Sequence, residues 1–456
     1  MVWHFLRKRK FQYAVVFILI LGFGLRMFVA TDPFLHEWDE RYHALVAKNT
    51  INGPLKPTLY INPILDYDYK NWVGNHVWVH KQPMTLWILA TSMKIFGVNL
   101  FGLRFLTVLI SLLAVWLTYL IGSKLYDKKV GIIAAYLHGI NGLIIEQTGG
   151  RVATDHVDVL FLFFIELAMW FIITYQGKRA WWNLMLIGAS TGFAVLTKWL
   201  PALIIFPVFF AFDYKGWFDK KTMLHAFIIG LTILAVSAPW QIFTAIQYPL
   251  ENAWEKHFNW LHITSVLDNQ GGPFYYFFSK LRIHYGEIMY LPFIWLVIRK
   301  KNWFDRKKLA LLAWMMIPLL FFSIPKTKMQ GYTLFIAPAV FIVLALFVRN
   351  LSFSIPRLEK SSYQWIAKLI IGLLLFLPVR YCIERTKPFS TENRTPPIYM
   401  NRVLELQKNN TESLVIEGCS HPIETMFFTN HTAYEQQLSN AERLKVEKLG
   451  YKIVQF

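Results

Sequence analysis

Ionisable side chains are concentrated just after the first long apolar run of the chain. The stretch 36–43 reads His-Glu-Trp-Asp-Glu-Arg-Tyr-His and contains the adjacent carboxylates Asp39 and Glu40. A carboxylate in such a position can act as a general base that takes the proton of an incoming hydroxyl group. A solvated loop would have the same composition, so the stretch alone does not establish a site. Asp39 and Glu40 are therefore candidates whose role depends on what lies around them.

Further ionisable residues, which are cations, histidines and carboxylates, recur at other loops predicted on the same side of the molecule. These residues also have explanations that involve no catalysis. A lysine near the end of an apolar run, such as Lys198, often only extends its ammonium group to the membrane interface. Lysines in a short outer loop, such as Lys326 and Lys328, could contact anionic lipid. Several cations on one face would also suit a phosphate or pyrophosphate headgroup. The members of this group are His80, Lys81, Glu146, Arg151, Asp155, Asp158, Lys198, Glu255, His257, His262, Asp268, Lys326 and Lys328.

The elements that position these residues are long apolar runs. The chain is 55% hydrophobic and 17% aromatic, although its formal net charge is +19. Runs such as 11–30 have about 20 residues, the length that crosses a hydrocarbon core of roughly 30 Å. This combination excludes a basic soluble protein that binds nucleic acid and predicts a polytopic, all-α membrane protein. The predicted spans are 11–30, 102–125, 130–148, 156–175, 181–197, 200–213, 223–246, 284–299, 308–325, 331–349 and 364–382.

The basic residues also predict an orientation. Arg7, Lys8, Arg9 and Lys10 precede the first span, which places the N-terminus in the cytoplasm by the positive-inside rule. An odd number of spans then places the C-terminal tail outside the cytoplasmic (inner) membrane. The run 84–96 has about 13 residues and both its ends are predicted outside, so we expect an interfacial helix there.

Two polar segments are predicted outside the membrane. Residues 31–83 form a large first outer loop of the catalytic domain, 1–383. Residues 384–456 form a small α/β domain, with strands at 413–418 and 451–456 around helices at 422–429 and 439–449. A domain of about 70 residues is marginally stable alone, so we expect it to dock on the membrane part. No internal repeat is evident.

An ordered series of motifs resembles a known group of enzymes. The motifs resemble those of the membrane-embedded GT-C glycosyltransferases (families 39 and 83), in particular bacterial aminoarabinose–lipid A transferases and protein O-mannosyltransferase-like enzymes. The resemblance extends over roughly residues 10–350 and implies the GT-C fold with about 11–13 transmembrane helices. The motifs are WDERYHALVAKN (38–49), HKQPMTLWILATSMKIFG (80–97), RFLTVLISLLAV (104–115), RVATD (151–155), LTKWLP (196–201), APW (238–240) and IPKTKMQGYTLFIAPA (324–339).

The resemblance implies roles for individual residues. Asp39 matches the essential carboxylate of the first outer loop, and Lys81 matches a lysine that contacts the donor phosphate. His80 stands where some relatives have a glutamate metal ligand, and His257 matches a later loop histidine, so the two could hold a zinc-like divalent metal. Relatives have an arginine where this chain has His262, which weakens that part of the match. Arg151 with Asp155 and Lys198 also match family positions, and Lys326 is a further candidate for the donor phosphate.

The implied reaction transfers a sugar from a polyprenyl-phosphate donor to a lipid A, glycan or protein acceptor, with inversion at the anomeric carbon. A glycosyl phosphate already has a good leaving group, so the site needs a base and cations rather than an acid. Two alternatives remain. An oligosaccharide ligase or polymerase would use a polyprenyl-linked donor with a longer glycan. A lipid or solute transporter would usually show internal repeats and charges near mid-bilayer, which this chain lacks.

Overall fold

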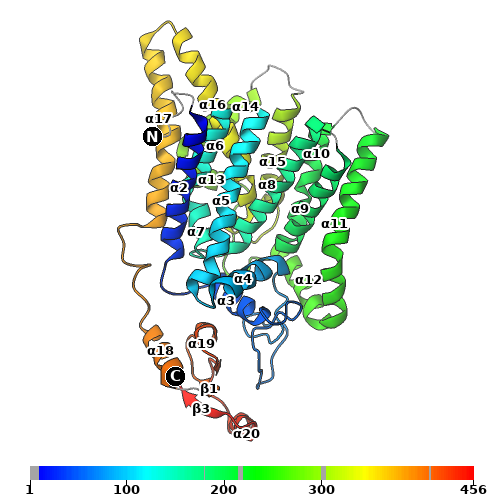
Figure 1. Cartoon of the computed structure of the whole chain (residues 1–456), viewed down its shortest axis with the longest axis vertical. Helices are drawn as coiled ribbons and strands as arrows, with labels where there is room; N and C mark the ends of the chain where they lie inside the picture. The colour runs from blue at the N-terminus through cyan, green and yellow to red at the C-terminus, as the bar shows by residue number, and fades with distance from the viewer. Residues whose placement is uncertain (1–9, 179, 214–218, 299–304, 410–411) are drawn as a thin grey trace.

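The computed structural model describes residues 10–178, 180–213, 219–298, 305–409 and 412–456 and shows a bundle of long helices with a small sheet near the C-terminus (Figure 1). Several residues used to predict the orientation, among them Arg7, Lys8 and Arg9, lie outside the described residues. Among the described residues, six helices are long and apolar enough to cross a membrane, and two bent pairs raise the number to eight.

All eleven predicted spans coincide with helices of the bundle. Three of them are not among the helices that are both long and apolar enough to cross a membrane: α9, α15 and the short run of η1 and α10. Of these, α9 packs against both α8 and α11. The helices are α2 (Phe11–Ala30), α5 (Leu100–Leu125), α6 (Lys128–Gly139), α7 (Gly142–Thr148), α8 (Asp155–Lys178), α9 (Trp181–Lys198), η1 (Leu200–Ile204), α10 (Ile205–Asp213), α11 (Lys220–Gln247), α13 (Tyr276–Tyr285), η2 (Glu287–Met289), α14 (Tyr290–Ile298), α15 (Arg306–Ser323), η3 (Gln330–Ile336), α16 (Ala337–Ser354), η4 (Ile355–Arg357) and α17 (Ser361–Thr386).

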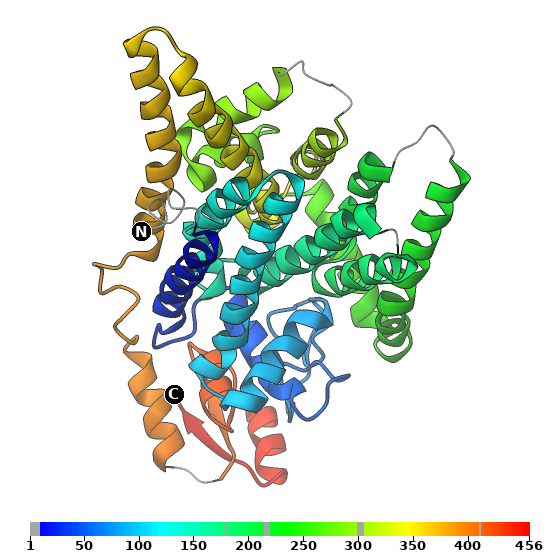
Figure 2. The same ribbon diagram turned by 45° about the horizontal axis from the view of Figure 1, so that its top comes forward.

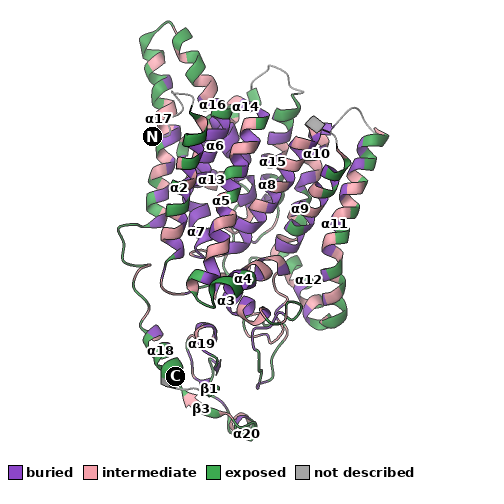
Figure 3. Cartoon of the chain, viewed as in Figure 1, coloured by how far each residue is buried: buried purple, intermediate pink, exposed green. Residues whose placement is uncertain are grey.

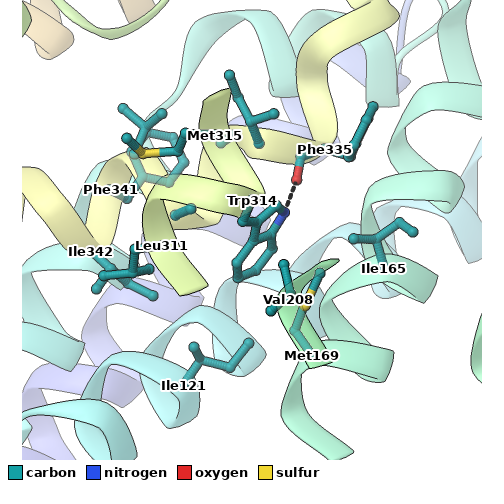
Figure 4. Packing of buried hydrophobic residues seen from close by; sticks show 14 of the residues in the cluster. Ile121, Ile165, Met169, Val208, Leu311, Trp314, Met315, Phe335, Phe341 and Ile342 are labelled. Atoms are coloured by element: carbon teal, nitrogen blue, oxygen red, sulfur yellow. Dashed lines mark hydrogen bonds between the residues drawn. The ribbon is translucent and has the colours of Figure 1, made fainter. Parts of the chain in front are cut away.

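Burial separates central helices from peripheral ones (Figure 3). In the most apolar 18-residue window of Gln330–Arg357, which includes α16, 94% of the residues are buried, whereas the fractions for the corresponding windows of α11 and α17 are 22% and 28%. Apolar side chains exposed on α11 and α17 are what a lipid-facing surface requires. In the core, the indole Nε1 of Trp314 donates a hydrogen bond to the carbonyl oxygen of Phe335 at 2.9 Å, so the buried polar atom of this side chain is satisfied (Figure 4).

Helices that lie outside the bundle gather at one of its ends (Figure 1). They are α3 (Asp39–Thr50), α4 (Pro83–Phe96) and α12 (Pro249–Thr264). Asp39 and Glu40 occupy the first turn of α3, where the helix dipole favours negative charge. Proline at the first position of α4 has no amide hydrogen to leave unpaired, which explains why the helix begins there. The helix predicted at 84–96 is thus present.

The C-terminal region is a small α/β unit, as predicted, and the structure shows that its strands are parallel. Strands β1 and β3 and helices α19 and α20 fall within the predicted ranges, whereas the two-residue strand β2 was not predicted because it is too short to show alternation. The sheet order is β2-β1-β3. The elements are α18 (Tyr399–Asn409), β1 (Leu414–Glu417), α19 (Pro422–Phe428), β2 (Thr432–Ala433), α20 (Asn440–Lys448) and β3 (Lys452–Gln455).

This C-terminal unit packs against the loop that follows α2 (Figure 2). Apolar residues of both segments form one buried cluster, in which the rings of Tyr60 and Tyr434 stack with centroids 5.3 Å apart. The ammonium of Lys48 on α3 also donates to the carbonyl oxygens of Met426 at 2.8 Å and Thr429 at 2.7 Å, near the end of α19. The division of the chain at residue 384 stays a prediction, since α17 continues to Thr386.

Candidate functional site

A cavity of about 420 Å³ opens where α3, α9 and α12 meet at the end of the bundle. Its wall combines charged and polar groups with a large apolar part, and several of the apolar residues, such as Leu200 and Phe321, are more than half exposed. The lining residues are Asp39, His80, Lys81, Gln82, Thr154, Val157, Thr197, Lys198, Trp199, Leu200, Pro201, Lys256, Phe258, Asn259, Trp260, His262, Ile263, Phe321, Phe322, Pro325, Met329 and Tyr332.

Asp39 is held in this cavity from two sides. Its Oδ2 accepts a hydrogen bond from the backbone N–H of Thr154 at 3.0 Å and lies 3.8 Å from Nζ of Lys81. Burial alone would raise the pKa of Asp39, but the charges of Lys81 and His43 together with the Thr154 hydrogen bond lower it to about 2. The carboxylate is therefore ionised at neutral pH, and Lys81 keeps it a weak base.

Lys198 supplies a second cation at the end of α9. Its ammonium forms an ion pair with Asp158 on α8 and lies 4.9 Å from the centroid of the Tyr332 ring. Lys81 and Lys198 thus both face the cavity, and each has a carboxylate partner. Two cations held in this way can accept a phosphate without the cost of burying an unpaired charge.

Backbone strain is concentrated around the same groups. Trp38, Thr154 and Trp199 have φ angles of 69°, 64° and 70°, which bulky and β-branched side chains rarely adopt. Trp38 immediately precedes Asp39, Thr154 donates to it, and Trp199 immediately follows Lys198. Strain of this kind persists where the surrounding structure fixes a side chain in a required position. The three residues therefore support the cavity as the candidate functional site.

His80 and His262 also line the cavity. The Nδ1 of His80 lies 2.9 Å from Oε2 of Glu255, and its ring stacks on Trp72 with centroids 4.6 Å apart. Nδ1 of His262 is 2.9 Å from the carbonyl oxygen of Phe258. Burial lowers the pKa of both histidines, so both rings are neutral at pH 7.

The predicted metal pair does not come together. His257 is exposed, contacts Trp254 at a centroid distance of 5.3 Å and is not among the residues that line the cavity. The structure gives the Nδ1 of His80 a carboxylate partner instead. Among the described residues, no group of three His, Cys, Asp or Glu side chains could hold a metal ion. The residues of this cavity do not fit a zinc-like centre.

Glu40 takes a structural position instead of a place in the cavity. Its two carboxylate oxygens accept hydrogen bonds from Nε of Arg104 at 2.7 Å and from Nη2 of the same residue at 2.9 Å, and both side chains are fully buried. The backbone N–H of His36 also donates to Glu40 at 2.7 Å. A carboxylate with these partners fixes the start of α3 and leaves its neighbour Asp39 as the carboxylate that faces the cavity.

Three further predicted residues also lie outside the cavity lining. Arg151 forms a bidentate ion pair with Asp32, at 2.6 and 2.9 Å, and donates to the carbonyl oxygen of Thr386 at 2.7 Å, so it ties α2 to the end of α17. Oδ1 of Asp155 lies 3.0 Å from Nδ1 of His43. His43 is on α3, one turn after Asp39. Lys326 is exposed on the loop after α15.

The cavity also contains residues that the motifs did not single out. Tyr332 is part of the predicted motif 324–339 but was assigned no role, and Lys256 stands directly before the predicted His257. Lys256 is exposed at the mouth of the cavity. The loop composition offered a signal for Lys256, since it adds a cation to a loop already chosen for its histidines.

Comparisons with known proteins identify sequence relatives of this chain. Residues 80–243 match the family of dolichyl-phosphate-mannose-protein mannosyltransferases. Undecaprenyl phosphate-alpha-4-amino-4-deoxy-L-arabinose arabinosyl transferase 1 of Pseudomonas fluorescens (strain Pf0-1) is 29% identical over 284 residues, which are 58% of this chain and 48% of the relative. The chain thus spans about half the length of this curated relative.

Solved structures share the fold at low identity. ArnT from Cupriavidus metallidurans bound to undecaprenyl phosphate has a TM-score of 0.67 and 15% identity, over 97% of this chain and 89% of that one. The archaeal oligosaccharyltransferase AglB from Archaeoglobus fulgidus, in complex with an inhibitory peptide and a dolichol-phosphate, has a TM-score of 0.62 and 14% identity, over 98% and 69%. The predicted fold and resemblance are therefore confirmed: this chain is a multi-pass membrane protein of the GT-C glycosyltransferase fold, similar to the aminoarabinose transferases.

Proposed function

We propose that this protein transfers a sugar from a polyprenyl-phosphate donor to an acceptor outside the cytoplasmic membrane, with Asp39 as the general base. The observation that carries the proposal is the position of Asp39, held by Thr154 and Lys81 in a cavity that also presents Lys198. A base beside two cations is what displacement of a phosphate by a hydroxyl group requires.

In the proposed step, the acceptor oxygen attacks the anomeric carbon while the bond from this carbon to the phosphate oxygen breaks. Asp39 takes the acceptor proton, and the departing lipid phosphate leaves with the bonding electrons. Lys81 and Lys198 stabilise the negative charge that develops on that phosphate. Attack opposite to the leaving group inverts the anomeric carbon. Arg104 with Glu40 holds the start of α3, so the pair acts on the reaction through the position of Asp39.

The apolar wall of the cavity supports a lipid-linked donor. Leu200 and Phe321 are 56% and 52% exposed, beside lysines that would face the phosphate. A water-soluble nucleotide sugar would gain nothing from this wall, whereas a prenyl chain can lie along it. The acceptor is a lipid A, glycan or protein group, and either a hexosyl or a pentosyl donor would fit the chemistry.

The lipid product distinguishes this proposal from its alternatives. Purified protein would be incubated with a polyprenyl-phosphate sugar and with an envelope extract as acceptor, and the lipids would be identified by mass spectrometry. We expect polyprenyl monophosphate to accumulate with time. Polyprenyl pyrophosphate from a pyrophosphate-linked glycan would indicate a ligase, and unchanged donor with lipid movement across vesicles would indicate a transporter.

A further inference from the structure

A second cavity, of about 380 Å³, lies between the loop after α2 and the C-terminal unit. Its floor is aromatic. Tyr60 stacks on Tyr434, and the ring of Tyr67 lies 4.2 Å from that of His76. Tyr60 and Tyr434 are buried, whereas Tyr67 is 36% exposed. Flat aromatic faces beside polar groups provide both apolar and hydrogen-bonding contact to a ligand.

The rim of this cavity carries carboxylates and amides. Asp66, Asp68 and Glu435 are exposed carboxylates, and Asn71 and Gln436 add groups that both donate and accept hydrogen bonds. Such a rim can bind several hydroxyl groups at once.

The neighbouring cations do not balance all three carboxylates: Nζ of Lys445 lies 3.6 Å from Oδ1 of Asp66, whereas Arg41 pairs with Glu424 and not with a rim carboxylate. Arg41 donates to Glu424 at 3.2 Å, and its Nε is buried without a hydrogen-bond partner in the described part of the chain. Burial lowers the pKa of His76, so that ring is neutral at pH 7. The three rim carboxylates therefore outnumber the charged cations among the described lining residues. Phosphate would be repelled, and neutral hydroxyl or cationic amino groups would be favoured.

Helix α3 connects the two cavities. Its first residue, Asp39, lines the first cavity, while Arg41 and Tyr42 line the second. We propose that the second cavity binds unphosphorylated sugar units, neutral or amino-substituted, of a glycan-bearing acceptor. The assignment to an acceptor rests on the proposed function. Beyond the proposed function, this second site gives the C-terminal unit a part in recognition of the acceptor.

A cavity-filling variant with a matched control tests this proposal. Gly74 lines the cavity, and a Cβ atom there would meet no atom closer than 3.7 Å, so Gly74→Trp can place a large ring in the space. Gly53 has the same freedom, with its nearest neighbour also at 3.7 Å, but does not line the cavity. Gly53→Trp is therefore the control for adding an indole to this loop.

Binding would be measured by saturation-transfer NMR on the full chain in nanodiscs. The probes for the second cavity are the disaccharides of N-acetylglucosamine, of glucosamine and of mannose, together with the monosaccharides glucosamine and glucosamine 6-phosphate. Polyprenyl phosphate is the probe for the first cavity. We expect wild type and Gly53→Trp to bind at least one disaccharide, with Gly74→Trp at least about tenfold weaker, a difference of about 1.4 kcal/mol. Polyprenyl phosphate should bind all three proteins equally.

The charge of the rim gives an independent readout. Wild type should prefer glucosamine over its 6-phosphate, and the double variant Asp68→Asn/Glu435→Gln should narrow that preference. Two results would overturn the second site and leave the proposed function unaffected. In one, Gly74→Trp binds the disaccharides as well as wild type does. In the other, wild type binds polyprenyl phosphate but none of the disaccharides. Loss of polyprenyl phosphate binding in wild type would instead count against the proposed function.

Discussion

At the scale of single residues, Lys81 controls how strong a base Asp39 is. Burial by itself would raise the pKa of the carboxyl group, and Lys81, 3.8 Å away, contributes most to the opposite shift. A donor phosphate that attracts Lys81 would weaken its hold on Asp39 and make the carboxylate a better proton acceptor. In the proposed mechanism, Asp39 is therefore a weak base in the apo protein and becomes a stronger one when the donor is bound.

This coupling predicts a change in the pH profile of the enzyme. With the pKa of Asp39 at about 2, the free wild-type enzyme keeps its base ionised, so kcat/KM should not fall between pH 8 and 5 through this group. In Lys81→Met, the lysine charge no longer opposes the effect of burial, so the pKa of Asp39 should rise. The carboxylate would then become protonated as the pH drops from 8 to 5, and kcat/KM should fall over that range. Lys256→Met, at the cavity mouth, is the control and should keep the wild-type shape. A flat profile in Lys81→Met would refute the coupling.

The Glu40–Arg104 pair predicts an effect on stability. Arg104→Met would leave a fully buried carboxylate without its cation, which typically costs about 3–5 kcal/mol of the free energy of unfolding. Thermal unfolding of the detergent-solubilised protein would show this as a lower Tm. Arg380→Met removes an arginine from an exposed pair with Glu384 and should leave the Tm unchanged. Equal Tm values for both variants would mean that Glu40 has no structural role.

Neighbouring residues show where reasoning from the sequence ends. Asp39 and Glu40 are equivalent as a sequence pattern, but successive residues on a helix point about 100° apart. Which one faces the cavity depends on where Arg104, 64 positions further along the chain, lies in the fold. Arg151 was likewise assigned to the donor phosphate. Its ion pair with Asp32 joins two segments that are far apart in the chain, so no local pattern in the sequence indicates it. Lys81 and Lys198, in contrast, line the cavity with Asp39.

At the scale of elements, the start of η3 closes one side of the first cavity. Gly331 lies against the α8 groups that hold Lys198, and a Cβ atom at that position would come within 2.0 Å of Oδ2 of Asp158 and 2.3 Å of Oγ1 of Thr154. These are the residues that anchor Lys198 and donate to Asp39. The absence of a side chain at 331 is thus a requirement of the site.

Gly331→Ala should therefore lower turnover more than a glycine substitution elsewhere in the bundle. We expect a fall of at least about tenfold in kcat, because displacement of Asp158 and Thr154 disturbs both the cation and the base. Gly372 on α17 has no atom within 4 Å of an added Cβ, so Gly372→Ala should be neutral or slightly stabilising. Turnover of the two purified variants at equal folded fraction is the measurement. Equal activities would show that the contact at residue 331 tolerates displacement.

Elements were easier to predict than the site because their signals are local. A run of apolar residues identifies a span without reference to any other segment, which is why each predicted span coincides with a helix. Bends were missed for the same reason: the 117° break between α13 and the following helices, at Gly286 with φ 105°, does not interrupt the apolar composition.

At the scale of the whole molecule, the loop after α2 and the C-terminal unit form one body on one side of the bundle. They share a buried apolar cluster, so both must lie on the same side of the membrane, and the prediction that this is the outer side can be tested. Both native cysteines, Cys382 and Cys419, are buried, which gives a low background for thiol labelling.

Labelling of intact cells with a membrane-impermeant maleimide tests this orientation. Exposed positions in the two segments, in Asn62→Cys and Glu447→Cys, should both react. Lys128→Cys, at the exposed first residue of α6, should react only after the membrane is permeabilised, because α6 begins at the opposite end of the bundle (Figure 1). The reverse pattern would place the candidate site in the cytoplasm.

The central claim is that Asp39 is the base that activates the acceptor. Asp39→Asn keeps the shape of the side chain and can still accept from Thr154, but it cannot take a proton. With purified protein and a polyprenyl-phosphate sugar, we expect single-turnover release of polyprenyl monophosphate to fall by at least about 10²-fold while donor affinity is largely retained. Glu37→Gln, an exposed neighbour, should behave as wild type. Near-wild-type release by Asp39→Asn would contradict the account.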